Sequence, residues 1–241
     1  MFKSDFHMHT IASGHAFGTI WEMAKIAKEK GVEVLAITDH GPAAGSTDEA
    51  YFRCLDRNPD RIEGVRILSG VEANIIDKDG HIDLSEKILE KLDIVIAGFH
   101  DGIGSYKNQD VKTNTDVFIK VIQNPFVKML SHPYSSTNNL DLDMEMICKA
   151  ATENNVALEV NASYFFREAK YTPVMIEKFK EMIFYAKENK TKLIVNSDAH
   201  CAFEVGRFDE VVEKFSEFGL SEADFINNDL KEIEEFFGIK I

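Results

Sequence analysis

Histidines and carboxylates recur at one kind of place in this sequence, at or just after the ends of short apolar, β-branched segments. Seven of the eight histidines lie there, namely His7, His9, His15, His40, His100, His132 and His200. Four carboxylates follow the same rule, namely Asp5, Asp39, Glu72 and Asp198. Neutral imidazole and carboxylate oxygen together are typical ligands of zinc, manganese or iron. The pattern predicts a metal site built from distant parts of the chain.

The His7-Met8-His9 motif can chelate one ion, because side chains two residues apart lie on the same side of an extended strand. A single histidine at a strand end is more often structural than a ligand, but the joint pattern favours metal binding. We expect His81, in a turn-like segment, to lie on the surface. Cys201 is either a soft ligand or a buried free thiol.

The number of candidate ligands predicts more than one ion. A catalytic zinc uses about three protein ligands and a water, so the histidines with Glu72 and Asp198 suffice for roughly three ions if one carboxylate bridges. Paired ions about 3.5 to 4 Å apart activate a shared water and neutralise phosphoryl oxygens, which suits phosphoester hydrolysis. Asp5 and Asp39 are further possible ligands, but we favour a role in which they accept hydrogen bonds and orient histidine rings.

The elements that position these residues alternate between strand-like and helical patterns. Strands are predicted at residues 3–7, 32–38, 64–71, 93–99, 128–131, 157–161 and 192–197. Helices are predicted at residues 20–30, 141–154, 173–188 and 203–218, with one or two more in the tail at 221–241. This βαβα order is typical of a parallel sheet, whose strands all end on one face. Alternation alone does not distinguish a closed barrel from an open sheet.

Composition indicates an ordinary globular domain. The 241 residues carry a net charge of −14, which disfavours nucleic-acid binding and favours a small phosphorylated substrate. No apolar stretch approaches the roughly 20 residues of a membrane span, and the N-terminus lacks a signal peptide, so we expect a cytoplasmic protein that does not contact membranes. Three cysteines without CxxC spacing predict free thiols. No linker interrupts the chain, so we expect one domain spanning residues 1–241.

Four short motifs in this order resemble the polymerase and histidinol phosphatase (PHP) superfamily. They are Asp5-Phe6-His7-Met8-His9-Thr10, Thr38-Asp39-His40, Ser131-His132-Pro133 and Ser197-Asp198-Ala199-His200. Further segments are similar to the small single-domain bacterial PHP phosphatases with a three-zinc site, namely Gly41-Pro42, Gly70-Val71-Glu72-Ala73-Asn74, Ala97-Gly98-Phe99-His100 and Ala202-Phe203. The resemblance covers nearly the whole chain.

The resemblance implies an α/β fold, a distorted (β/α)7 TIM-like barrel, and a trinuclear site. It implies three divalent ions, zinc with manganese or iron as alternatives. The first ion would be held by His7, His9, Glu72 and Asp198, and the second by the bridging Glu72 with His100 and His132. The third would be held by His15, His40 and His200. Some relatives of this pattern are trimers, so a homo-oligomer is a further expectation.

The predicted activity is metal-dependent hydrolysis of phosphoric monoesters by an activated hydroxide, with no catalytic residue assigned beyond the metal ligands. Arg167 and Arg207 are candidate phosphate contacts, although either could be an ordinary surface arginine. Tyr164 and Phe165 either line the pocket or pack against a helix. The loops at residues 42–60, 101–113 and 134–141 are expected to select the substrate.

Three alternatives remain open at this stage. A phosphodiesterase or nuclease of the same superfamily would use the same metal chemistry, but the negative charge disfavours it. A barrel amidohydrolase usually relies on a bridging lysine, whereas Glu72 stands where the bridge is needed. A non-catalytic metal-binding protein is the third, but structural metal sites are normally closed by four ligands rather than spread over seven strand ends.

Overall fold

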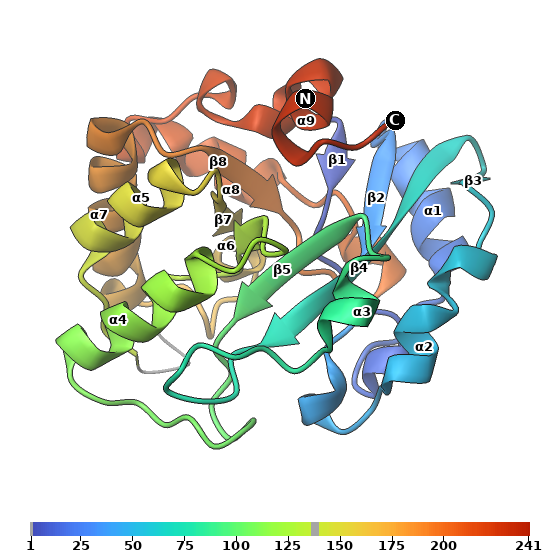
Figure 1. Ribbon diagram of the computed structural model, residues 1–241. Coiled ribbons are helices and arrows are strands. Elements are labelled where there is room, and N and C mark those ends of the chain that lie inside the picture. The colour runs from blue at the N-terminus through green and yellow to red at the C-terminus, as the bar shows by residue number, and fades with distance from the viewer. Residues whose placement is uncertain (1, 136–139) are drawn as a thin grey trace.

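Seven parallel strands form the centre of the molecule, whose computed structural model describes residues 2–135 and 140–241. They are β1 (Ser4–Asp5), β2 (Val34–Ile37), β4 (Val65–Asn74), β5 (Ile94–Gly98), β6 (Met129–Leu130), β7 (Ala157–Asn161) and β8 (Leu193–Asn196), and each pairs with the next in this order (Figure 1). The short β3 (Arg61–Ile62) pairs antiparallel with β4. Beyond β1 and β8 the chain nearly closes the ring, because His9 N–H donates to the Ala199 carbonyl at 2.8 Å. The predicted distorted seven-stranded barrel is confirmed.

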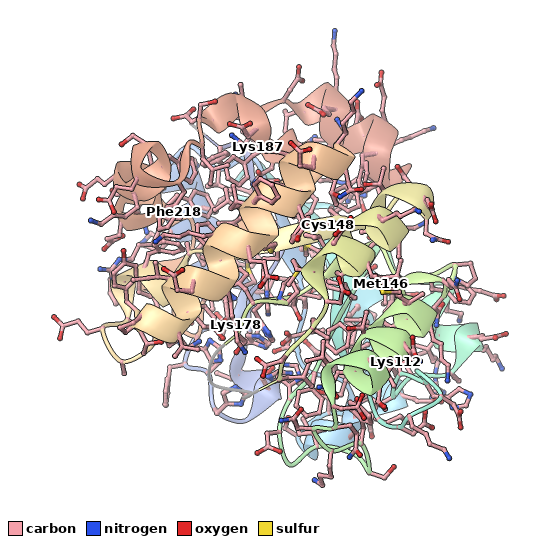
Figure 2. All side chains as sticks on the ribbon, turned by 90° about the vertical axis from the view of Figure 1, so that its left-hand side faces the viewer. Lys112, Met146, Cys148, Lys178, Lys187 and Phe218 are labelled. Atoms are coloured by element: carbon pink, nitrogen blue, oxygen red, sulfur yellow. The ribbon has the colours of Figure 1, made fainter. Side chains whose placement is uncertain are left out.

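Helices surround this barrel. They are α1 (Ile20–Glu29), α2 (Glu49–Arg53), α3 (Glu86–Leu89), α4 (Val111–Ile122), α5 (Met144–Glu153), α6 (Ser163–Phe166), α7 (Pro173–Asn189), α8 (Asp209–Lys214) and α9 (Leu230–Phe237). Side-chain caps fix several starts, as where Thr19 and Glu22 form a capping box at α1. Figure 2 shows α4, α5 and α7 packed side by side over one flank. None of the helices in the described ranges is both long and apolar enough to cross a bilayer.

The predicted helix at residues 203–218 is wrong, because the chain breaks it into three short pieces. A 3-10 turn at Ala202–Glu204 precedes α8, and a second 3-10 turn at Phe215–Phe218 follows it. Gly206 has a φ of +61°, a left-handed conformation that glycine adopts readily, and its N–H donates to Asp5 Oδ2 at 2.9 Å. This bond ties the turn to the end of β1, so the helix cannot begin before it.

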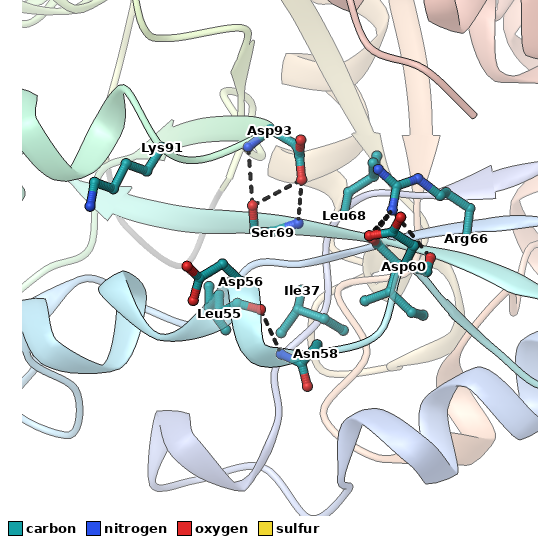
Figure 3. A pocket seen from close by; sticks show the side chains of 11 residues that line it. Ile37, Leu55, Asp56, Asn58, Asp60, Arg66, Leu68, Ser69, Lys91 and Asp93 are labelled. Atoms are coloured by element: carbon teal, nitrogen blue, oxygen red, sulfur yellow. Dashed lines mark hydrogen bonds and ion pairs between the residues drawn. The ribbon is translucent and has the colours of Figure 1, made fainter.

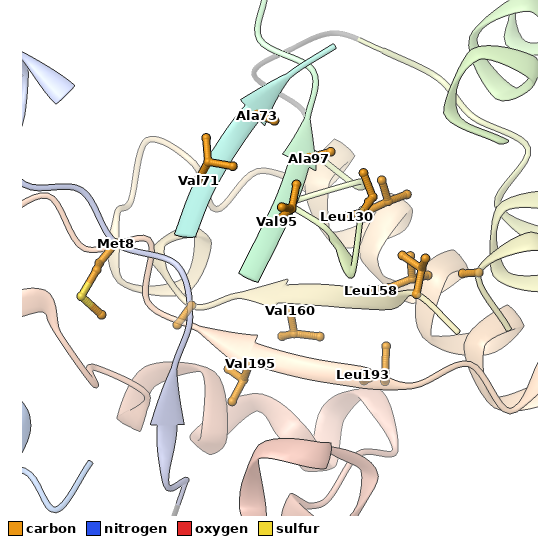
Figure 4. Packing of buried hydrophobic residues seen from close by; sticks show 14 of the residues in the cluster. Met8, Val71, Ala73, Val95, Ala97, Leu130, Leu158, Val160, Leu193 and Val195 are labelled. Carbon is orange, nitrogen blue, oxygen red and sulfur yellow. The ribbon is translucent and has the colours of Figure 1, made fainter. Parts of the chain in front are cut away.

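Alternation along the strands divides the core into two parts. Val71, Val95 and Leu158 point toward the helices, as Figure 4 shows. The intervening residues face the barrel interior, where apolar side chains such as Leu68 and Ile94 pack into a cluster that α9 completes with Ile233 and Phe237. One end of the interior is therefore sealed by hydrophobic packing.

Toward the carboxyl ends of the strands the barrel interior becomes polar. Two residues beyond Leu68 the inward position of β4 is Gly70, and two further it is Glu72. The inward side chain of β7 changes from Ala157 to Glu159 in the same way. Because side chains of a strand alternate between two faces, these carboxylates must project into the barrel rather than toward the helices. The open end of the barrel is therefore lined with charge.

Cys148 of α5 lies in the layer between helices and barrel, as Figure 2 shows, and offers a simple test of the packing. Burial raises the pKa of the Cys148 thiol to about 12, whereas Cys54 and Cys201 are partly exposed. We expect iodoacetamide at about pH 8 to alkylate Cys54 and Cys201 but to spare Cys148, because the thiolate is the reactive form. Peptide mass spectrometry before and after denaturation measures this, and rapid alkylation of Cys148 in native protein would contradict the packing.

Candidate metal centre

The predicted ligands meet at the open, carboxyl-terminal end of the barrel. They lie at or after the ends of six of the seven strands, and the set comprises His7, His9, His15, His40, Glu72, His100, His132, Asp198 and His200. All but His15, His100 and His200 are buried. His81 lies elsewhere, with a side chain 70% exposed that pairs with Asp77, so its prediction as a surface residue is confirmed.

Three overlapping groups of ligand atoms are compact enough to hold a cation. They are His7 with His9 and Asp198, His7 with Glu72 and His132, and His9 with His40 and Glu72, and within each group the atoms lie within 4.8 Å of one another. The groups share members, so the ions they hold would be close neighbours. Bringing two such ions together requires an anionic ligand between them.

Glu72 has the geometry of that bridging ligand. Its Oε2 lies 3.2 Å from His7 Nε2 and 3.3 Å from His9 Nε2. Its Oε1 lies 3.0 Å from His132 Nε2 and 3.3 Å from His100 Nε2. The two carboxylate oxygens therefore face different sets of imidazoles, since Oε2 also has His40 Nδ1 at 3.1 Å. Burial alone would raise the pKa of Glu72, but the nearby His7 and His100 hold it well below its ordinary value, so the carboxylate stays ionised.

His15, His40 and His200 lie beside this pair of groups. His15 Nε2 and His200 Nε2 are 3.0 Å apart, and the rings of His15 and His40 are 5.3 Å apart between centroids. His40 Nδ1 also lies 3.1 Å from Glu72 Oε2, and in the compact groups His40 is joined to His9 and Glu72. The expected set for a third ion is thus gathered in one place, while its exact division among ions stays a prediction.

Hydrogen bonds on the outer side of four histidines fix their tautomers. In each ring Nδ1–H donates outward. His7 donates to Glu159 Oε1 at 2.7 Å, and His9 donates to Ser13 Oγ at 3.1 Å. His15 donates to the Ser13 carbonyl at 2.8 Å, and His200 donates to the Asp198 carbonyl at 2.9 Å. The Nε2 lone pairs therefore point inward, toward one another and toward the carboxylates. This is the arrangement that metal-binding histidines require.

The inward-facing atoms fit divalent cations. His7 Nε2 and His9 Nε2 are 3.2 Å apart, close enough for one cation to bind both ring nitrogens. His40 Nδ1, which faces Glu72 Oε2, is buried and has no hydrogen-bond partner within the described residues. Burial lowers the pKa of His40 to about 2 and that of His200 to about 4, so both rings are neutral at physiological pH. The donor set, imidazole nitrogen with carboxylate oxygen, is that of zinc, manganese or iron sites.

Asp39 and Asp5 hold the loops around the centre. Asp39 Oδ1 accepts from Ser13 Oγ at 2.6 Å, and its Oδ2 accepts from Tyr51 Oη at 2.5 Å. Because Ser13 in turn accepts from His9, Asp39 orients that ring through the serine, as expected. The expectation that Asp5 orients a histidine ring is wrong. Its carboxylate accepts hydrogen bonds from the backbone N–H groups of Ser197 and Gly206 and so fixes the loop after β8.

Glu159 is a contributor that the sequence did not reveal. It is fully buried, and besides His7 it accepts from the backbone N–H of His132 at 2.8 Å and from Asn161 and Asn196 Nδ2 at 3.2 and 3.1 Å. The only signal was a charged residue inside an otherwise apolar strand. It joins one histidine ring to the backbone of another.

Two site residues adopt a backbone conformation that non-glycine residues rarely populate. His132 has a φ of +33° and Asp198 a φ of +53°. Such conformations cost of order 1–3 kcal/mol and persist where the surroundings hold them. For His132 the bond from its N–H to Glu159 is one such restraint. The strain turns the His132 side chain back over the barrel mouth toward Glu72.

Replacing Glu159 by glutamine tests this positioning role. Without an anionic acceptor for the Nδ1–H of His7, we expect zinc affinity to fall about 10- to 100-fold, the usual effect of removing an outer partner of a ligating histidine. Competition with a fluorescent chelator measures the affinity. Glu153→Gln, at an exposed position of α5, is the matched control. Equal affinities for the two variants would show that Glu159 does not act on the centre.

A cavity of about 150 Å³ opens over the centre. Its lining combines ligand residues with Tyr164, Arg167 and Lys170. Arg167 lies on the wall as expected, but its guanidinium donates to Glu204 Oε2 at 2.7 Å. Lys170 was not predicted, because its loop carries no recognisable motif.

Arg207 lies outside the lining of this cavity in the described chain. Its guanidinium is 4.3 Å from the centroid of the Phe166 ring, and its Nε donates to Glu210 at 2.7 Å. The placement offers no support for the expected phosphate contact and matches the alternative of an ordinary surface arginine. The predicted substrate loop at 134–141 falls partly outside the described residues.

A larger hollow, of about 230 Å³, lies away from the centre between β4 and the preceding loop (Figure 3). Several of its polar groups pair with one another, since Asp93 Oδ2 accepts from both the N–H and the hydroxyl of Ser69, and Arg66 pairs with Asp60 at 3.4 Å. None of the candidate ligands belongs to its lining in the described chain. The chemistry is therefore concentrated at the barrel mouth.

Strand order and ligand cluster together define a metal-binding α/β barrel. The model of the PHP domain family matches residues 5–163, and the chain belongs to this family. A “Probable phosphatase” of Caldanaerobacter subterraneus subsp. tengcongensis is 41% identical over 237 residues, which cover 96% of this chain and 89% of the relative. A “Probable phosphatase” of Proteus mirabilis is 38% identical, with coverages of 98% and 94%.

Solved structures share the fold at low identity. The histidinol phosphate phosphatase of Lactococcus lactis, solved with zinc, L-histidinol and phosphate, matches with a TM-score of 0.62 at 17% identity and covers 91% of this chain and 94% of its own. A chain of an archaeal ribonuclease P with mature tRNA matches with a TM-score of 0.63 at 12% identity, with coverages of 97% and 90%. Since this fold also occurs in a tRNA-bound assembly, the activity must be argued from the site.

Proposed function

We propose that this protein is a metal-dependent phosphatase that hydrolyses phosphoric monoesters. The observation that carries the proposal is Glu72, whose two oxygens face separate sets of imidazoles at 3.0 to 3.3 Å and so suit a bridge between two neighbouring ions. Relatives of up to 41% identity over nearly the full chain carry the name phosphatase. A net charge of −14 further favours small substrates over nucleic acids.

Three divalent ions are the proposed cofactor, zinc with manganese or iron as alternatives. Seven histidines, Glu72 and Asp198 supply enough donors, and the Lactococcus lactis protein of the same fold was solved with zinc and phosphate. When bound, such ions lower the pKa of a coordinated water and offset charge on phosphoryl oxygens. His7, His9, Glu72 and Asp198 would hold the first, Glu72, His100 and His132 the second, and His15, His40 and His200 the third.

The protein's own groups then have distinct tasks. The outward hydrogen bonds of four rings keep the Nε2 atoms aimed inward, so the donors are preorganised before any substrate arrives. The small cavity limits the water that surrounds a bound phosphoryl group, which strengthens electrostatic interactions there. Arg167 and Lys170 place positive charge on the wall of the same cavity that the ligand residues line.

A direct assay tests the proposal. We expect protein loaded with zinc or manganese to hydrolyse p-nitrophenyl phosphate faster than bis(p-nitrophenyl) phosphate, and a chelator-treated sample to hydrolyse neither. Faster cleavage of the diester would favour the phosphodiesterase or nuclease alternative. No turnover of either ester by fully metallated protein would favour a non-catalytic metal-binding role. A single domain over residues 1–241, a homo-oligomer such as a trimer, and a cytoplasmic location stay predictions.

A further inference from the structure

Lys170 holds a positive charge at the edge of the metal centre. The residue lies in the segment between α6 and α7, and its Nζ is 3.1 Å from Ser163 Oγ and 3.5 Å from Asp198 Oδ2. The ammonium also lies 4.7 Å from the centroid of the Tyr164 ring, within reach of a cation–π contact. Three different groups thus restrain the end of a side chain that is 23% exposed and borders the cavity.

The ammonium retains donor capacity toward the cavity. A lysine has three N–H donors, and across the described ranges this one makes a single hydrogen bond, to Ser163, and one longer ion pair, to Asp198. Asp198 Oδ2 already accepts from Asn161 Nδ2 and from Ser163 Oγ, each at 3.2 Å. Its Oδ1 faces the histidines, 3.4 Å from His9 Nε2. Asp198 is therefore shared too widely to satisfy the lysine.

With divalent cations bound nearby, the position of Lys170 would be electrostatically unfavourable unless a further anion joined it. Like charges a few ångströms apart repel in a partly desolvated site, and Lys170 lies beside a cluster suited to several divalent cations. An anion bound between them would convert that repulsion into attraction on both sides. Arg167 on the same wall is already paired with Glu204 at 2.7 Å, so Lys170 is the better placed of the two to bind an anion in the cavity. Lysine binds phosphate commonly, as a compact point charge.

We propose that Lys170 binds a non-bridging phosphoryl oxygen of the substrate and makes the site select monoesters over diesters, an inference that rests on the proposed phosphatase function. A phosphoric monoester carries a charge between about −1.5 and −2 near neutral pH and three non-bridging oxygens. A diester carries one charge and has only two such oxygens. Two oxygens can face the metals while the third contacts Lys170, and the diester has an ester group in that third place.

Lys170→Met and Lys170→Gln in the zinc-loaded protein test the assignment. We expect kcat/KM for p-nitrophenyl phosphate to fall about 10- to 100-fold, as for loss of a charged hydrogen-bond partner, with a much smaller change for bis(p-nitrophenyl) phosphate. The Kd for inorganic phosphate, measured by calorimetry, should rise by a similar factor. Lys170→Arg should recover part of both losses, because it keeps the charge.

The matched control is Lys178→Met. Lys178 on α7 is comparably buried, with a side chain 19% exposed, and it is ion-paired to Asp141 at 2.8 Å, but it lies outside the cavity lining described here. We expect this variant to keep wild-type kinetics and phosphate affinity. Zinc content by mass spectrometry and the melting temperature are measured for every variant.

The outcomes separate a substrate contact from a structural one. A parallel loss for both esters, with lower zinc content or melting temperature, would mean that Lys170 only supports Asp198, and would overturn the proposal. Wild-type phosphate affinity in Lys170→Met would overturn it as well. If the wild-type protein hydrolyses neither ester, the phosphatase function fails, but a weaker Kd for phosphate in the variants would still establish the anion contact.

Discussion

Glutamine at position 72 is expected to abolish most of the activity and to reduce the number of bound metal ions. Glu72 is buried, and its two oxygens face five histidine nitrogens at 3.0 to 3.3 Å. Glu72→Gln keeps the shape of the side chain but removes its charge and places an amide N–H₂ where one oxygen now faces imidazole lone pairs. The two groups of ligands would lose their shared anion.

The magnitude follows from comparison with weaker perturbations. Loss of an outer partner of a metal ligand already lowers affinity or activity about 10- to 100-fold, so loss of the bridging charge should cost at least about 100-fold in kcat/KM for a phosphoric monoester. His100→Ala should also abolish turnover, because it removes one of the proposed ligands of the second ion. The fold should persist, because the other ligands stay in place. Metal content by mass spectrometry and kcat/KM are measured together.

Glu90→Gln is the control for a change of charge alone, since Glu90 is exposed after α3. It should retain full metal content and activity. Circular dichroism should show that Glu72→Gln remains folded, because the apolar part of the barrel interior does not depend on the ions. A Glu72→Gln protein with a full complement of metal and wild-type turnover would contradict the bridged arrangement.

The fold was predictable where hydrophobic patterning decides it. Strands that are buried on both faces read as continuous apolar runs, and β5 and β8 are such runs. Helix α4 was not among the predicted helices, because its start within a polar loop depends on the Asp110 cap. The broken segment at 203–218 has a helical pattern that a tertiary contact overrides, the bond from Gly206 to Asp5.

The candidate site was predictable only in part for a similar reason. A parallel barrel brings the ends of all its strands together, so histidines at strand ends are expected to converge. Glu159 lies in the middle of a strand, where its contact with His7 depends on how far each strand extends into the barrel. Lys170 reaches the centre from a loop. The hydrophobic periodicity that predicts helices and strands does not predict the course of a loop. The positive φ of His132 could not be predicted either, because histidine, unlike glycine, does not indicate a left-handed backbone conformation.

Gly98→Ala is expected to destabilise the protein and weaken metal binding, because the centre leaves no room for a side chain at this position. A Cβ at this position would overlap with Ser131 Oγ and would lie 3.3 Å from His132 Cε1 and 3.4 Å from Glu72 Oε1. Gly98→Ala would therefore push the segment after β6, which carries His132, away from Glu72. We expect a loss of about 1–3 kcal/mol in the free energy of unfolding, as for other overpacked sites, together with weaker metal binding and slower turnover.

Ser131→Ala separates the steric conflict with Ser131 Oγ from other effects of Gly98→Ala. Ser131 Oγ is buried without a hydrogen-bond partner in the described part of the chain, so Ser131→Ala alone should leave stability and metal affinity nearly unchanged. In the double variant the closest contact disappears and only the two looser ones remain. We expect Gly98→Ala with Ser131→Ala to recover most of the stability and part of the zinc affinity, measured by thermal unfolding and chelator competition. A double variant as impaired as Gly98→Ala would show that glycine is needed at this position for a reason other than the space taken by Ser131.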